Sequence, residues 1–235
     1  MALKYNRVLL KLSGEALAGE KKTGLDADTI RPICESIKKA HDLGAQIAIV
    51  VGGGNFWRGR SSGEMERTTA DKIGMLATVM NALALKDAFR QVGADACVMT
   101  SLEMNQVAEP FLRDNAVKHL EEGKIVIFGG GTGNPFFSTD TGSTLRAAEI
   151  GADIMLKLTM VDGVYDKDPH KYTDAVKYDT LTFTQVLNDK LAVMDSTAAT
   201  MCRDNHLPIL VFDISDPDNL VRAVQGEKLG TLVCE

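Results

Sequence analysis

The sequence predicts an α/β protein in which helices cover both faces of a mainly parallel sheet. Three observations predict this class. Short runs of Val, Ile and Leu recur with little polar alternation, which is typical of strands buried on both faces. Longer segments with helical spacing separate these runs, and glycine-rich turns follow several of them. Strands and helices that alternate along one chain indicate an open parallel sheet.

Six apolar runs are the expected strands, at residues 8–12, 46–51, 96–100, 125–128, 154–158 and 209–212. Four helices are expected at residues 30–41, 75–89, 145–149 and 195–205. Asp26 or Asp28 is placed to cap the first helix, and Asp195 is placed to cap the fourth. Glycines placed to end the first three helices are Gly44, Gly93 and Gly151.

The composition is that of a globular protein, and we expect one domain over residues 1–235. Apolar residues make up 45% and charged residues 25%, which excludes a mostly disordered chain. The net charge is −6, so the chain lacks the positive field that phosphate backbones require. We therefore expect no nucleic-acid partner.

Cysteine spacing and hydropathy indicate the compartment. The four cysteines lie far apart without a CxxC pair, which favours reduced thiols over a disulfide framework or a zinc site. Lys11 interrupts the first apolar run, so that run does not resemble an export signal. No run approaches the ~20 apolar residues that span a bilayer. These patterns predict a cytoplasmic protein without a membrane partner.

Glycine-rich turns follow three of the expected strands. They are Ser13-Gly14, Gly52-Gly53-Gly54 and the run of residues 129–133. In an open parallel sheet, ligands bind at the carboxyl ends of the strands, where glycine lets backbone amides approach an anion. Any one of these turns could equally serve backbone geometry alone. Two separate triple-glycine clusters favour a ligand with several phosphates, or two phosphorylated ligands.

The best-known phosphate motifs are missing from the sequence. The chain has no GxxxxGK[ST] P-loop, because Gly123-Lys124 is followed by Ile125. It has no GxGxxG in register after a strand, and no HRD or DFG triplet. A Walker-type NTPase and a protein kinase are therefore excluded, and a Rossmann dehydrogenase is disfavoured.

A few charged residues near the turns are candidates for phosphate chemistry. Lys11 lies in an apolar strand, and Arg58 follows the second glycine turn with a planar group that suits phosphate oxygens. The alternatives are a snorkelling lysine and a solvated arginine. Lys157 is a further candidate for phosphate contact. Asp140 opens a helix, where it could act as a cap, orient a lysine or interact with a metal ion.

Several motifs together resemble the bacterial uridylate kinases of the amino-acid kinase superfamily, over essentially the whole chain. The segments are residues 11–17 (KLSGEAL), 52–59, 71–81, 131–140 (GTGNPFFSTD), 162–169 and 193–195. The resemblance implies a three-layer αβα sandwich and transfer of the γ-phosphoryl group of ATP to UMP, giving UDP. It also implies Mg²⁺ bound with ATP, no metal ligand from the protein, and a homohexamer.

The resemblance implies roles for individual residues. The implied catalytic residues are Lys11, Arg58 and Asp140. ATP would contact Lys11, Leu12, Ser13, Gly14, Gly54 and Arg58, with Thr159, Tyr165 and Asp168 at its nucleoside end. UMP would contact Gly53, Asp71, Thr132, Gly133, Asn134, Pro135, Phe136, Phe137, Ser138 and Thr139. In this scheme Asp71 holds the ribose hydroxyls, and residues 132–139 read the uracil.

Family members are activated by GTP and inhibited by UTP, and the resemblance extends that expectation to this chain. The segment implied for GTP is Gly19, Glu20, Lys21, Lys22, Thr23 and Gly24, although its lysines could equally be solvated. Two other functions stay open. One is a related kinase that acts on carbamate, acetylglutamate, aspartate or isopentenyl phosphate, and the other is a non-catalytic nucleotide-binding regulator. Residues 135–140 and the region of Asp71 favour UMP, and the presence of Lys11 and Asp140 favours an enzyme.

Overall fold

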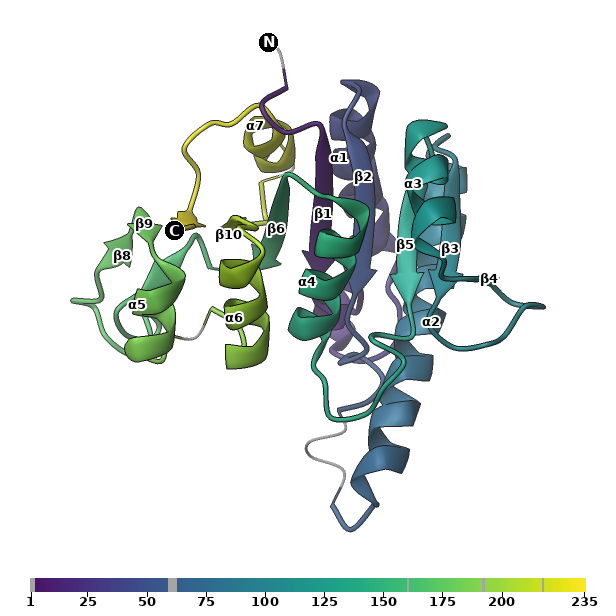
Figure 1. Cartoon of the computed structure of the whole chain (residues 1–235), viewed down its shortest axis with the longest axis horizontal. Coiled ribbons are helices and arrows are strands. Elements are labelled where there is room, and N and C mark those ends of the chain that lie inside the picture. Colours follow the sequence, from purple (N-terminus) through teal and green to yellow (C-terminus); the bar gives the residue numbers. More distant parts are fainter. Residues whose placement is uncertain (1–2, 59–62, 160, 192, 217) are drawn as a thin grey trace.

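A nine-stranded sheet forms the centre of the computed structural model, which describes residues 3–58, 63–159, 161–191, 193–216 and 218–235 (Figure 1). The strand order is β4-β3-β5-β2-β1-β6-β10-β11-β9. The strands are β1 (Arg7–Leu12), β2 (Gln46–Val51), β3 (Ala96–Thr100), β4 (Glu109–Pro110), β5 (Ile125–Gly129), β6 (Ile154–Thr159), β9 (Thr180–Leu181), β10 (Ile209–Asp213) and β11 (Thr231–Val233). Pairing is parallel from β4 to β10, and β11 runs antiparallel to β10.

The six strands expected from apolar runs are confirmed, to within one residue at either end. The residue pattern does not predict the short strands β4, β9 and β11, nor the separate pair β7 (Val164–Tyr165) and β8 (Lys177–Tyr178). These strands have two or three residues each, so they are too short to show a periodicity. Long-range pairing, which a local pattern does not record, determines that they are strands.

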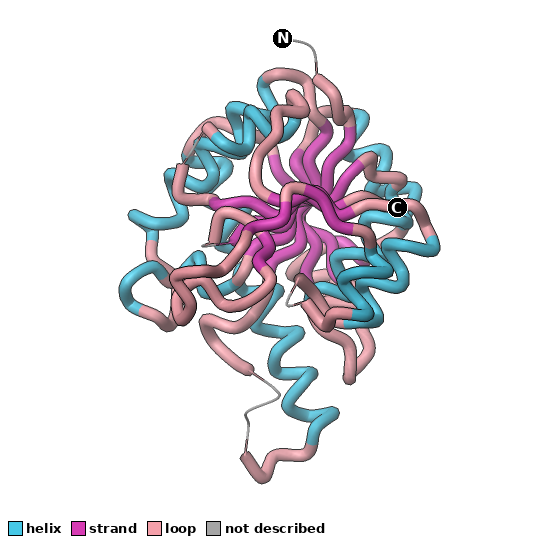
Figure 2. Tube along the Cα trace, turned by 90° about the vertical axis from the view of Figure 1, so that its left-hand side faces the viewer, coloured by secondary structure: helices cyan, strands magenta, loops and turns pink. Residues whose placement is uncertain are grey.

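Helices cover both faces of the sheet, which confirms the αβα sandwich (Figure 2). They are α1 (Ala27–Asp42), α2 (Arg67–Gln91), α3 (Arg113–Glu121), α4 (Thr139–Ile150), α5 (Phe183–Asn188), α6 (Ser196–Asp204) and α7 (Asn219–Val224). One hydrophobic core packs α1, α2 and α7 against the sheet. The other core packs α3 to α6 against the opposite face. Adjacent β1 residues alternate between the two cores, since Leu9 lies in one and Leu10 in the other.

The helix ends predicted from capping residues are confirmed where local hydrogen bonding or backbone conformation determines them. Asp195 caps α6 by accepting the Ala198 N–H at 3.0 Å, and Gly151 ends α4 with a φ of 64°. Asp26 precedes α1, but its side chain accepts from the Thr29 hydroxyl and forms no side-chain cap with the helix backbone. The second and third helices begin earlier than expected, because α2 starts at Arg67 and α4 at Thr139.

The topology brings the three glycine turns to one edge of the sheet. Strands β1, β2 and β5 are parallel neighbours, so their carboxyl ends lie side by side. The same edge receives the end of β6, which pairs with β1 on its other side. In Figure 1 this is the lower edge, and the first turns of α2 extend beyond it.

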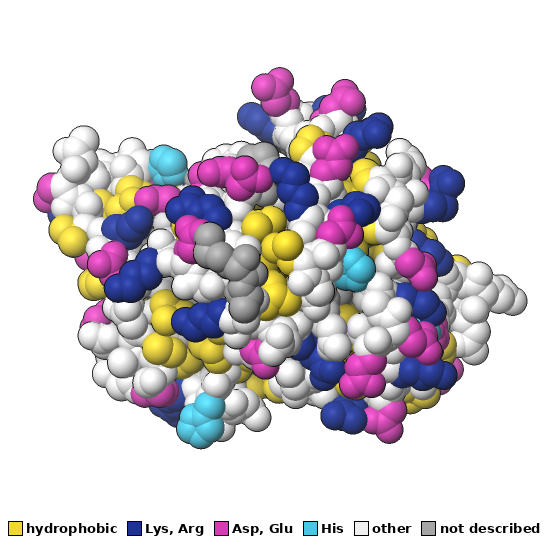
Figure 3. All heavy atoms as spheres, turned by 90° about the horizontal axis from the view of Figure 1, so that it is seen from above, with side chains coloured by type: hydrophobic (Ala, Val, Ile, Leu, Met, Phe, Trp, Pro, Cys, Tyr) yellow, Lys and Arg dark blue, Asp and Glu magenta, His cyan; other side chains and the backbone are white. Residues whose placement is uncertain are grey.

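Two surface properties bear on possible partners. In the part of the chain that the structure describes, none of the helices is both long and apolar enough to cross a membrane. On the face shown in Figure 3, acidic and basic side chains lie interspersed. Such a surface differs from the continuous positive field that a nucleic-acid backbone requires.

Candidate active site

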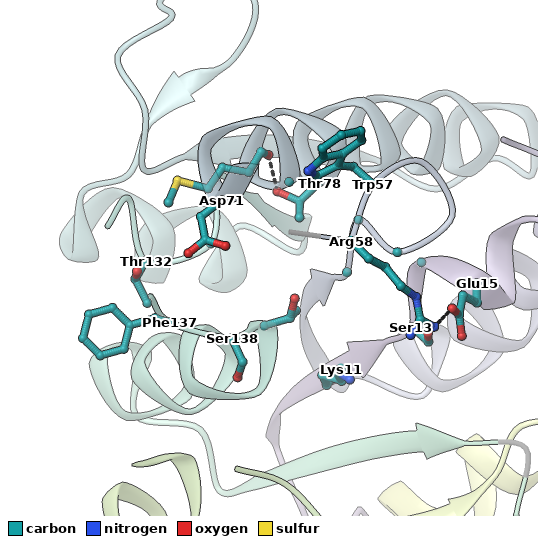
Figure 4. A pocket seen from close by; sticks show the side chains of 18 of the residues that line it. Lys11, Ser13, Glu15, Trp57, Arg58, Asp71, Thr78, Thr132, Phe137 and Ser138 are labelled. Atoms are coloured by element: carbon teal, nitrogen blue, oxygen red, sulfur yellow. Dashed lines mark hydrogen bonds and ion pairs between the residues drawn. The ribbon is translucent and has the colours of Figure 1, made fainter. Parts of the chain in front are cut away.

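A cavity of about 470 Å³ opens at the edge of the sheet where the glycine turns meet. Its wall comes from the ends of β1 and β2, the first turns of α2, and the segment that leads into α4. In Figure 4, Lys11, Arg58 and Glu15 gather at one end of the view, whereas Asp71, Thr132 and Phe137 lie at the other. We call the first of these the charged end, and the second end carries the Phe137 ring together with the Asp71 carboxylate.

Three charged side chains meet at the charged end. Lys11 on β1 and Lys157 on β6 are direct neighbours in the parallel register. Asp140, in the first turn of α4, lies between them: its Oδ1 is 2.9 Å from the Lys11 ammonium and its Oδ2 is 2.9 Å from that of Lys157. Each of the three side chains is less than one fifth exposed. Two ammonium groups and one carboxylate give this cluster a net charge of +1, and Lys11 is its member that lines the cavity.

Burial and charge act against each other in this cluster. Burial would raise the pKa of Asp140, but the ammonium groups of Lys11 and Lys157 outweigh it and hold that pKa below its ordinary value. Burial lowers the pKa of Lys157, and the Asp140 carboxylate offsets only part of that effect. Lys157 also donates to the Val193 carbonyl. The structure thus directs Lys157 toward Asp140 and a backbone carbonyl, and Lys157 does not line the cavity.

Backbone contacts explain why two of the turns need glycine. A Cβ on Gly14 would lie 2.4 Å from the Gly52 carbonyl oxygen and 2.6 Å from the Asn55 Oδ1. A Cβ on Gly53 would lie 2.8 Å from the Gly74 carbonyl oxygen in α2. These turns pack so closely on each other and on α2 that no side chain fits between them. Their backbone is exposed to the cavity instead, where amides can meet an anion.

The arginines of the cavity are both paired with carboxylates. Arg58 forms an ion pair with Glu15, which lies in the turn after β1. Arg67 donates to Asp71 Oδ2 at 2.8 Å from one helical turn away on α2. The same Oδ2 accepts the Phe136 N–H at 2.7 Å. Asp71 therefore ties α2 to the segment before α4 and faces the cavity.

The segment before α4 is held by its own helix cap. Ser138 accepts the Thr141 N–H at 3.1 Å and donates its hydroxyl to Asp195, the cap of α6. Phe136 has a φ of 73° and is 62% exposed, while Phe137 lines the cavity and is 49% exposed. The Phe137 ring is thus available to cover a ligand, while Ser138 and Asp195 anchor the end of the segment.

A second cavity of about 450 Å³ adjoins the first, and Ser13 and Glu15 line both. Its other walls include apolar side chains from α1, β6 and the segment after β10: Ile33, Leu158 and Ile214. Thr159 and Gly19 also line it. An apolar slot beside a charged turn suits a ligand with a flat aromatic part and an anionic part.

The structure brings most of the expected site residues together. Those that line the first cavity are Lys11, Ser13, Gly14, Gly53, Gly54, Arg58, Asp71, Thr132, Asn134, Phe137, Ser138 and Thr139. Among the described residues, those expected at the site that line neither cavity are Leu12, Gly133, Pro135, Phe136, Asp140, Tyr165 and Asp168, and all of the segment 19–24 except Gly19. Tyr165 instead donates to Asp162, and Asp168 pairs with Lys171.

Sequence reasoning did not assign several residues of the cavity wall: Glu15, Trp57, Arg67, Met75 and Thr78. The sequence contains a pattern that indicates two of these residues. Trp57 directly precedes Arg58, and Arg67 stands four residues before Asp71, the spacing of a helical ion pair. In the described part of the chain, no group of three or more His, Cys, Asp or Glu side chains is placed to hold a metal ion.

The chain is similar to known proteins over almost its whole length. Residues 6–213 match the sequence model of the amino acid kinase family. The structure of UMP kinase from Bacillus anthracis is 40% identical, with a TM-score of 0.95, over 98% of this chain and 96% of that chain. UMP kinase from Ureaplasma parvum is 34% identical, with a TM-score of 0.92, over 99% and 100% of the two chains. Uridylate kinase from Archaeoglobus fulgidus is 29% identical, with a TM-score of 0.71, over 97% and 99%. The chain is therefore a phosphotransferase of the amino acid kinase family and belongs, within that family, to the UMP kinases.

Proposed function

We propose that the protein transfers the γ-phosphoryl group of ATP to UMP, giving UDP and ADP. The observation that carries this proposal is the pair of adjoining cavities, which share Ser13 and Glu15 beside the positively charged cluster of Lys11, Asp140 and Lys157. ATP would place its base in the second cavity and its phosphates at the shared wall. UMP would lie in the first cavity with its base toward Thr132 and Phe137.

The proposed mechanism depends on position and charge. Lys11 would neutralise the moving phosphoryl group, and the amides of the glycine turns would hold the phosphates on either side. Asp140 would keep the Lys11 ammonium in place, since it lies behind Lys11 and does not line the cavity. The phosphate of UMP is ionised at neutral pH, so the reaction requires no general base. Mg²⁺ would be held largely by ATP oxygens and water, the usual arrangement for this ion.

An acceptor screen tests the proposed reaction. ADP release should be fast with UMP and slow with CMP, AMP, GMP, carbamate, acetylglutamate, aspartate and isopentenyl phosphate. Rapid turnover with a non-nucleotide acceptor alone would contradict the proposal and indicate the activity of another member of the family. Nucleotide binding without turnover of any acceptor would favour the non-catalytic regulator.

Asp71 should control the affinity for the acceptor. We expect Asp71→Asn to raise the KM for UMP about tenfold and to leave the KM for ATP nearly unchanged, because it removes the charge that pairs with Arg67, lines the cavity and would bind the ribose. Initial rates at varied UMP and ATP measure both constants. Asp87→Asn is the matched control: Asp87 lies on the same helix and pairs with Arg90 at the surface. An equal rise in both constants would contradict the role of Asp71.

Trp57 should report on ligand binding directly. It is the only tryptophan in the sequence, and it lines the first cavity between Gly74 and Arg58. We expect UMP to change the intensity or the wavelength of its emission in a saturable way, because the polarity around the indole changes. The titration should give the same dissociation constant as calorimetry. An emission that stays constant while calorimetry shows binding would place UMP away from this wall.

Regulation and assembly are part of the proposal. GTP would activate the enzyme through the segment 19–24, and a contact supports this route: Gly24 donates to the carbonyl of Asn55, which follows the second glycine turn. UTP would inhibit the enzyme. Rates measured with each nucleotide at fixed UMP and ATP test both effects. The homohexamer is the assembly that the family resemblance implies, and Leu76 and Met80, each nearly half exposed on α2, are candidates for a contact between subunits. Light scattering should give six times the mass of the chain.

The four free thiols support a reducing compartment, the cytoplasm.

A further inference from the structure

Two buried asparagines lie directly behind the glycine turns, although neither belongs to the proposed catalytic machinery. Asn55 follows the second turn and is 2% exposed, and Asn81 lies on α2 and is fully buried. Their side-chain amides pair with each other in both directions, at 2.8 and 3.0 Å. A buried amide pair of this kind is costly unless all of its hydrogen bonds are made. The partners of the remaining N–H groups therefore indicate what the pair holds.

Both remaining N–H groups donate to backbone carbonyls. Asn81 Nδ2 donates to the Gly52 carbonyl at 2.6 Å, and Asn55 Nδ2 donates to the Gly24 carbonyl at 2.7 Å. Each NH₂ group thereby uses both of its hydrogens. Rotating either amide by half a turn would place its oxygen against one of these carbonyl oxygens, so the orientation of both amides is determined.

The bond from Asn81 decides which way the second glycine turn faces. In a trans peptide, the C=O and the N–H of one plane point in opposite directions. Because Asn81 draws the Gly52 carbonyl toward α2, the N–H of Gly53 is directed to the opposite side of that plane. The next carbonyl, that of Gly53, is also bound within the turn, by the N–H groups of Phe56 and Trp57 at 3.0 Å each. The N–H of Gly54 is turned away from it in the same manner. Both glycines line the first cavity.

We propose that Asn81 is a positioning residue that holds the second glycine turn with its amides, and not its carbonyls, toward the phosphate of the acceptor. This inference rests on the proposed function, whose acceptor is a phosphate ester. Without the bond to Asn81, the Gly52–Gly53 peptide can rotate and present its carbonyl oxygen to the anion, which repels it. Asn55 extends the constraint, because it ties the same turn to Gly24.

The test compares UMP with uridine, which lacks the phosphate. We expect Asn81→Leu and the smaller change Asn81→Ser to raise the dissociation constant of UMP on the order of tenfold, and to leave that of uridine within about twofold. Inorganic phosphate, used as a third probe, should lose affinity by the same factor as UMP. Calorimetry measures all three ligands, and Asn81→Ser serves if Asn81→Leu fails to fold.

The matched control is Thr231→Val. Thr231 is also fully buried and makes two hydrogen bonds, to the Tyr178 carbonyl and from the Val164 N–H, but it does not line either cavity. Its replacement should lower the melting temperature and leave the preference for UMP over uridine unchanged.

Two outcomes would overturn the inference: an equal loss of affinity for UMP and uridine in the Asn81 variants, or no loss for either ligand. Failure of the proposed function is a different result, namely wild-type enzyme that does not phosphorylate UMP. In that case the inorganic phosphate arm still tests Asn81, because it does not depend on which nucleoside the enzyme accepts.

Discussion

Replacing Lys11 with methionine should lower kcat about 10³-fold while the protein stays folded. The methionine side chain is nearly as long as that of lysine, so the β1 packing changes little, but the positive charge that lines the first cavity is lost. Lys157 cannot substitute for Lys11, because its ammonium is held by Asp140 and the Val193 carbonyl. The negative charge spread over the transferring phosphoryl group would then lack its nearest fixed cation.

Steady-state kinetics and circular dichroism measure this prediction together. A loss confined to kcat, with KM values for ATP and UMP changed only a few-fold, would show that Lys11 acts mainly in the transition state. Lys38→Met is the control, since Lys38 forms a helical ion pair with Asp42 at the surface of α1. A Lys11→Met enzyme with wild-type kcat would remove Lys11 from the mechanism.

Replacing Asp140 with alanine should affect both activity and stability. Lys11 and Lys157 are neighbours in the register of β1 and β6, and Asp140 is the carboxylate between them. Its removal leaves two ammonium groups facing each other at a site that is mostly buried. Breaking such a buried pair costs about 3 kcal/mol of the free energy of unfolding. We also expect kcat to fall about 10³-fold, because the Lys11 ammonium loses the group that holds it in place.

Urea unfolding and initial rates measure the two effects. The double variant Asp140→Ala/Lys157→Met should recover part of the lost stability, because it removes one of the unpaired ammonium groups, but it should not recover kcat. Asp114→Ala is the control: Asp114 also lies in the first turn of a helix and pairs with an arginine, but at the surface. If the double variant were less stable than Asp140→Ala, repulsion between the two lysines would not be the cause.

The stabilisation by Asp140 should depend on pH in a definite direction. The pKa of its carboxyl group in the folded protein lies below the ordinary 3.8, because the two ammonium groups outweigh the effect of burial. As long as Lys11 and Lys157 are charged, the carboxylate therefore stabilises the fold fully above pH 3.8, and this contribution is lost as the pH falls through the lower, folded-state pKa. The difference in unfolding free energy between wild type and Asp140→Ala should accordingly narrow below about pH 4.

Much of the architecture is local and could be predicted from residue patterns. An apolar run such as residues 46–51 has few alternatives to a buried strand, and Asp195 and Gly151 mark helix ends by their own hydrogen bonding and backbone preference. The glycine turns were also visible, since each follows a strand directly. In contrast, β11 has three residues and is a strand only because β10 and β9 pair with it.

The candidate site was only partly predictable for the same reason. Lys157 is a candidate for phosphate contact in the sequence, but the structure directs it to Asp140, because the register of β1 and β6 places it beside Lys11. Trp57 and Arg67 carry weak local signals and become part of a cavity only when α2 packs across the second glycine turn. The Asn55–Asn81 pair has no pattern at all in the sequence, since its members lie 26 residues apart.

The sequence by itself determined the αβα class, the principal strands and the positions of the glycine turns, because hydrophobic periodicity and backbone preference act over a few neighbouring residues. Only the tertiary structure decided which charges pair, which side chains line the cavities and which way the turns face. These properties depend on strand register and on contacts between residues as distant as Lys11 and Asp140, and no short stretch of sequence contains both partners of such a contact.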